Sequence, residues 1–220
     1  MNGALLRLLG WAWVLVPMGA EAHSPIPGIA PFYSGALHSF VVPAHLLSML
    51  GLGLWVGQRG LDFADRAVLV FAVALAAGLA LSATAGEPDT DLLLLAGGAA
   101  VGLIVALARP MPIVVMVAVA AALGLALGLG STPDGLVGSK RWVTLAGTWL
   151  GGLLGVMWFA AMAEFATRPW LKIAVRVVAS WVAASALLVL ALSWVGPRRE
   201  GTAPVAVRAG VAASATIQCA

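Results

Sequence analysis

Two histidines seven positions apart are the residues of this chain best suited to chemistry. They are His38 and His45 in the stretch HSFVVPAH, where few other side chains could bind an ion. Neutral imidazole is a common ligand for transition metals. An unbroken helix would place both rings on one face but about 10 Å apart along its axis. That separation is too long for one ion, which needs roughly 2 Å to each nitrogen.

A proline between the two histidines changes this geometry. Pro43 has no N–H, so the carbonyl of Ser39 loses its usual helical partner and the helix kinks or begins there. A break at Pro43 could bring His38 toward His45 and free a carbonyl as an extra ligand. Alternatively, Pro43 only starts a short helix and leaves His38 in a loop at the membrane surface.

Three further residues are candidate metal ligands. Met49 follows His45 by four positions, and its thioether suits copper(I), although a methionine of the core or the lipid face would look the same. Glu164 is the one acid inside the later apolar segments; it could relay protons, bind a cation, or pair with Arg168 at i+4. His23 could chelate an ion through its α-amine and imidazole if cleavage makes it the first residue.

The composition is that of a membrane protein. Of the 220 residues, 62% are hydrophobic and only 10% are charged, and the mean hydropathy is +1.03. Soluble domains carry about 25% charged residues. Stretches of the length that a spanning helix needs recur along the chain. They are residues 36–57, 67–84, 91–108, 111–130, 142–166 and 171–195, with connectors rich in glycine, proline or charge. We therefore expect an all-α membrane protein with a six-helix transmembrane bundle over residues 23–196.

The N-terminus reads as a cleavable signal peptide over residues 1–22. Arg7 precedes the short apolar run LLGWAWVLVPMG, and AEA supplies small residues before a cut after Ala22. An uncleaved first span is the alternative. The signal predicts the bacterial inner membrane, with the mature N-terminus in the periplasm. The cations then expected on the cytoplasmic side, as the positive-inside rule prefers, are Arg59, Arg66, Arg109, Arg168 and Lys172. Lys140, Arg141 and the arginines of the tail are expected on the periplasmic side, which makes the charge bias weak. Residues 197–220 form a polar tail that we expect to be poorly ordered.

Small residues and acids complete the pattern. Glycines recur every four positions at Gly53 and Gly57, Gly98 and Gly102, Gly124 and Gly128, and Gly147, Gly151 and Gly155. Such faces favour close helix packing in lipid, could join copies of the chain into a homo-oligomer, or could line a permeation route, and packing is favoured. Glu87, Asp89 and Asp91 form an acidic stretch that could attract cations or be a solvated turn.

Several function classes lack their signatures. Cys219 is the only cysteine, so there is no disulfide framework and no CxxC site. The sequence has no basic run with interleaved aromatics for nucleic acid. It also has no serine–histidine–acid set, HExxH motif or pair of buried carboxylates. We therefore expect neither an enzyme nor a tightly bound cofactor, and the expected partners are the lipid bilayer and a metal ion.

The signal, the histidine near the mature N-terminus, the six spans and the histidine pair resemble the HupE/UreJ family. The family motif has the form HPxxGxDH, and HSFVVPAH keeps both histidines at that separation, as His38 and His45. The continuation LLSMLGLGLWVGQ is also similar. Ser39, Val42 and Ala44 stand where the family has proline, glycine and aspartate, so the hard anionic ligand of the motif is absent.

The resemblance implies a secondary permease that takes up nickel or cobalt, with His38 and His45 as ligands. No ATPase motif is present, so gradients would drive transport. One alternative is a non-transporting membrane partner that holds or delivers a metal, plausibly copper, during assembly of a periplasmic or respiratory enzyme. Another is a membrane scaffold whose histidines only hydrogen-bond to neighbouring helices.

Overall fold

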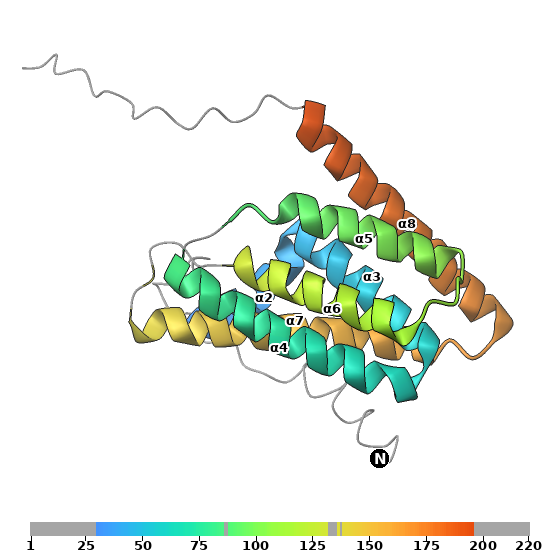
Figure 1. Cartoon of the computed structure of the whole chain (residues 1–220), viewed down its shortest axis with the longest axis horizontal. Coiled ribbons are helices and arrows are strands. Elements are labelled where there is room, and N and C mark those ends of the chain that lie inside the picture. Colours follow the sequence, from blue (N-terminus) through green and yellow to red (C-terminus); the bar gives the residue numbers. More distant parts are fainter. Residues whose placement is uncertain (1–29, 86–87, 132–135, 137, 196–220) are drawn as a thin grey trace, which may run out of the picture.

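The computed structural model describes residues 30–85, 88–131, 136 and 138–195. All regular structure in this part of the chain is helical (Figure 1). The predicted signal peptide over residues 1–22, His23 and the tail over residues 197–220 lie outside the described residues. The all-α prediction is confirmed for the part that is described.

Seven helices cover the six predicted apolar segments. In chain order they are α2 (Pro31–Val41), α3 (Pro43–Arg59), α4 (Leu61–Ala85), α5 (Asp91–Ala106), α6 (Ile113–Leu129), α7 (Ser139–Glu164) and α8 (Pro169–Val195). The last five helices each match one predicted segment. The first predicted segment, residues 36–57, is two helices, because α2 ends and α3 begins at the proline break.

Helix length separates two groups of candidate membrane spans. Residues Ala64–Thr84 of α4, Ser139–Glu164 of α7 and Pro169–Ser193 of α8 are long and apolar enough to cross a membrane, and α2 with α3 forms a fourth if the bent pair counts as one span. Helices α5 and α6 are apolar but have only 16 and 17 residues. At 1.5 Å per residue they measure about 24–26 Å, somewhat less than the roughly 30 Å of hydrocarbon. Within the described residues there are therefore three or four helices of full spanning length, and six spans stay a prediction.

Helix α3 lies at the centre of the bundle, between α5 and α7 (Figure 1). Helices α4 and α6 form a second close pair, α2 packs on α7, and α8 packs on α5. Residues of α3 and α5 meet in the same order along both helices, with Ser48 against Gly98 and Gly51 near Gly102. These two helices are therefore parallel, and their N-terminal ends lie at one end of the bundle.

The glycine repeats pack helices together, as predicted. A β-carbon added at Gly53 of α3 would lie 2.6 Å from Cβ of Phe159 in α7. One at Gly102 of α5 would lie 2.8 Å from the Ala179 carbonyl of α8. Real β-carbons do not approach other atoms so closely, so only glycine lets these backbones meet. The joining of copies of the chain through such faces stays a prediction.

Candidate metal-binding site at a proline break

The polypeptide bends sharply between the two histidines. Val42 is extended, with φ −78° and ψ 117°, and Pro43 is the first residue of α3. The axes of α2 and α3 differ by 76° across this break. The Val42 N–H donates to the His38 carbonyl at 3.2 Å and closes α2. The predicted break at Pro43 is confirmed, and the alternative that leaves His38 in a loop is wrong, because His38 lies within α2.

The bend brings the two imidazole rings together. The ring centroids of His38 and His45 are 5.4 Å apart, and the ring planes meet at 69°. Two imidazoles that share a tetrahedral ion, each at about 2 Å through one nitrogen, have ring centres roughly 5 Å apart. The pair therefore has a spacing that suits one ion, which an unbroken helix could not give.

The nitrogens of this pair are buried without hydrogen-bond partners. His45 is only 1% exposed, and neither its Nδ1 nor its Nε2 has a partner; Nε2 of His38 is in the same state. A buried polar atom left unpaired costs about 1–3 kcal/mol. These three atoms make none of the hydrogen bonds that the scaffold hypothesis expects. An ion bound between the rings would supply a partner for one nitrogen of each ring.

Ser39 is a polar residue of this region whose side chain was not among the candidate ligands. It is fully buried, and its hydroxyl oxygen also lacks a partner. Its neighbour in the chain, His38, belongs to the pair. The sequence already marked this position, since Ser39 stands where the resembled motif has proline.

Asp91 approaches the pair from another helix. The β-carbon of a residue at Gly98 would lie 3.3 Å from Cα of Ser48, so this face of α5 packs on α3 just after His45. Asp91 precedes Gly98 by seven residues, almost two turns, and so lies on the same face nearer to the break. Its carboxylate interacts electrostatically with the His38 imidazole. The sequence placed Asp91 only in an acidic stretch and could not show that α5 would carry it to His38.

Asp91 does not complete a ligand set in this conformation. Among the described residues, no three histidine, cysteine or acidic side chains are grouped closely enough to hold a metal ion. The local arrangement is thus two imidazoles that can act as ligands and one carboxylate that adds negative potential nearby.

Met49 lies in the core below the pair. It is 1% exposed and belongs to the main hydrophobic cluster. Its sulfur faces the glycine face of α7, 3.4 Å from the β-carbon position of Gly155 and 3.9 Å from that of Gly152. These contacts match the interpretation as a core methionine.

Glu164 lies at the other end of the bundle. It is the last residue of α7, directly after Ala163, whose side chain packs on Gly57 of α3. Gly57 follows His45 by twelve residues, or about 18 Å along α3. The structure therefore does not bring Glu164 to the histidine pair. The alternative of an i+4 pair between Glu164 and Arg168 requires both residues to lie in one helix. Because α7 ends at Glu164, they do not.

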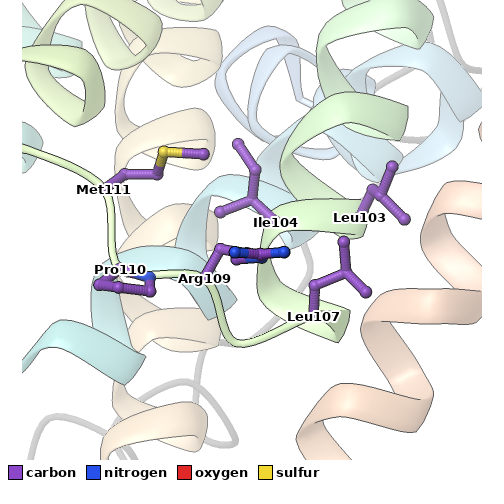
Figure 2. A pocket seen from close by; sticks show the side chains of 6 residues that line it. All are labelled: Leu103, Ile104, Leu107, Arg109, Pro110 and Met111. Atoms are coloured by element: carbon purple, nitrogen blue, oxygen red, sulfur yellow. The ribbon is translucent and has the colours of Figure 1, made fainter.

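A pocket of about 520 Å³ lies beside the turn between α5 and α6 (Figure 2). Its walls are Leu103, Ile104, Leu107, Arg109, Pro110 and Met111. Arg59, at the end of α3, donates a hydrogen bond to the Met111 carbonyl. The pocket is therefore at the end of α3 opposite to the histidines and is separate from their site.

Comparison with known proteins gives one match. The model of the family described as HupE / UreJ protein matches residues 11–193. No curated protein and no solved structure matches the chain.

Proposed function

Because the chain belongs to the HupE/UreJ family, we propose that it is a secondary permease that takes up a divalent transition metal, nickel or cobalt. The family is one of multi-pass membrane proteins associated with transport of these metals. One observation carries the proposal to this chain: the paired imidazoles of His38 and His45 have buried nitrogens without partners. In a membrane, costly polar groups of this kind are retained at sites of function.

The geometry suggests the order in which an ion meets the ligands. Asp89 is exposed before the start of α5, and Asp91 is exposed at its first residue. A cation drawn to these carboxylates would reach His38, which is partly exposed, before the fully buried His45. We propose that this end of the bundle faces the periplasm in the bacterial inner membrane, and that a gradient drives passage.

A second function is favoured by two features of the same site. Ala44, which is buried, offers no carboxylate where the resembled motif has aspartate. Leu52, Trp55 and Val56 of α3 are fully buried below the pair. A protein that holds a metal without moving it needs neither a carboxylate at position 44 nor a path past these three buried side chains. We therefore retain a non-transporting membrane partner for a periplasmic or respiratory metalloenzyme, with copper as its metal, as the alternative.

Metal accumulation in cells distinguishes the two functions. Cells that express the wild type should accumulate more nickel or cobalt than cells that express the His38→Ala, His45→Ala double variant. The matched control is Leu37→Ala, Leu46→Ala, which truncates the two neighbouring residues and should retain accumulation. Equal accumulation with wild type and the histidine variant would remove the permease. Copper(I) binding by the purified wild type without any accumulation would favour the alternative.

A further inference from the structure

Two arginines from different helices and one from the turn itself lie around the turn between α5 and α6. Arg59 of α3 donates to the Met111 carbonyl, and Arg176 of α8 donates to the Ala106 carbonyl at 2.8 Å. Arg109 lies in the turn itself and lines the pocket of about 520 Å³. A guanidinium carries five N–H donors, so the arginines that bind a carbonyl keep others free for an anion. Arg59 and Arg109 therefore lie at the same end of the bundle, and the assignment of this end to the cytoplasmic side stays a prediction.

The backbone of this turn is held in a defined shape. The Ala108 N–H donates to the Val105 carbonyl at 3.0 Å, and the Arg109 N–H donates to the Ile104 carbonyl at 3.2 Å. This pair of bonds closes the end of α5 as a Schellman motif, with Ala108 in the left-handed region at φ 49°. Arg109 is therefore carried by an ordered helix end.

The turn is recessed relative to the start of α8. Arg176, which contacts the end of α5, lies seven residues after Pro169, so α8 extends about 10 Å beyond that contact. Figure 1 shows the first turns of α8 continuing past the end of α5. The short helix α5 thus ends below the level reached by its neighbour, and this leaves a recess at the turn that Arg109 lines, while Arg59 and Arg176 bind carbonyls on either side of the turn.

The wall of the recess is apolar and faces outward. Leu103 of α5 and Leu107, the residue that caps the end of α5, are 54% and 56% exposed. In Figure 2 the Arg109 side chain extends beneath Ile104, between Pro110 and Leu107. An apolar wall that meets the Arg109 guanidinium at a helix end, with Arg59 and Arg176 bound to carbonyls on either side of the turn, matches a lipid, whose acyl chain is joined to a charged phosphate headgroup. Basic pockets between membrane helices bind anionic headgroups by this combination.

We propose that the recess at the α5–α6 turn binds one anionic phospholipid, with its phosphate on Arg109 and an acyl chain along Leu103 and Leu107. The Arg109 guanidinium, with Arg59 and Arg176 on either side of the turn, selects a negative headgroup over a zwitterionic one. The apolar wall selects a lipid over a free phosphate ion. This site is separate from the histidine pair, so its test does not depend on metal binding.

Native mass spectrometry of the detergent-solubilised full chain tests the proposal with phosphatidylglycerol, phosphatidylcholine and inorganic phosphate as probes. The wild type should retain phosphatidylglycerol. Arg109→Gln should retain about fivefold less, the effect of one basic side chain near an anionic lipid. Lys140→Gln removes the same charge from an exposed position at the start of α7 and should bind like the wild type. A double variant, Arg109→Gln with Arg176→Gln, should lower retention further.

Three outcomes would overturn the proposal. One is equal retention of phosphatidylglycerol by the wild type and Arg109→Gln. Another is equal retention of phosphatidylcholine and phosphatidylglycerol by the wild type. The third is displacement of phosphatidylglycerol by millimolar inorganic phosphate, which would assign the arginines to a free anion. Thermal unfolding of each variant in detergent shows that lost binding does not reflect a lost fold.

Discussion

The rings of His38 and His45 lie edge to face across the bend at Val42, with their centroids 5.4 Å apart. Each ring comes from a different helix, although only seven positions separate the two residues. The contact buries imidazole nitrogens that no other group satisfies. This arrangement leads to the first three predictions below.

Removal of either imidazole should abolish most of the metal affinity. Mutation of a residue that only hydrogen-bonds to a metal ligand typically lowers metal affinity 10–100-fold. Removal of the ligand itself should therefore lower metal affinity at least tenfold. The double variant His38→Ala, His45→Ala should be little worse than either single one, because one remaining ring cannot share an ion. Calorimetric titration of the purified protein with Ni²⁺ or Co²⁺ measures this. Wild-type affinity in either single variant would show that the rings are not joint ligands.

Substitution of the proline should weaken binding without unfolding the protein. Pro43→Ala restores an N–H that can donate to the Ser39 carbonyl, so α2 and α3 can approach one continuous helix. The rings would then separate toward the about 10 Å of a straight helix, and metal affinity should fall several-fold. Pro31→Ala changes the first residue of α2, away from the bend, and serves as the control. Unchanged affinity in Pro43→Ala, with circular dichroism showing a folded protein, would contradict the role given to the bend.

Neutralisation of Asp91 should weaken cation binding modestly. Its charge interacts with His38 but completes no ligand set, and Asp91 is exposed to solvent. Asp91→Asn should therefore lower Ni²⁺ affinity about fivefold, or about 1 kcal/mol, the size of a charge interaction at close range in a water-like dielectric. Asp65→Asn removes a carboxylate near the start of α4 and should leave affinity unchanged. The same titration checks both variants. A loss of a hundredfold or more in Asp91→Asn would instead make Asp91 a direct ligand.

A methyl group on the glycine face of α3 should destabilise the bundle at one position and not at another. A β-carbon at Gly57 would meet the Ala160 backbone and lie 2.8 Å from Cβ of Ala163. Gly57→Ala should therefore cost about 1–3 kcal/mol through overpacking. At Gly51 the nearest atom would be 3.4 Å away, so Gly51→Ala should be tolerated. Thermal unfolding in detergent compares the two, and equal midpoints would contradict the packing described for α3 and α7.

Much of the fold followed from the sequence because apolar length and breakers are local signals. The predicted segments over residues 142–166 and 171–195 correspond closely to Ser139–Glu164 and Pro169–Val195. The four-residue glycine spacing predicted close packing, since glycines at that interval share a helix face. The break at Pro43 also followed from one residue, because proline cannot donate to the preceding turn.

The rest depended on contacts between distant parts of the chain. The size of the bend could not be predicted, because it depends on how α2 packs on α7 through Gly35, Gly147 and Gly151. The approach of Asp91 to His38 follows from the parallel packing of α3 and α5, which no local pattern specifies. The pairing of Glu164 with Arg168 assumed a helix through residue 168, whereas the chain leaves the helix at residue 164.

The bend at Val42 joins two short helical segments that each carry one of the histidines. His38 stands four residues before it and His45 three residues after it, so the separation of the rings follows the angle of this single joint. A smaller bend at Val42 would move the rings apart and end their joint hold on an ion. Because α2 packs along α7, the angle at Val42 is tied to the contact between these two helices.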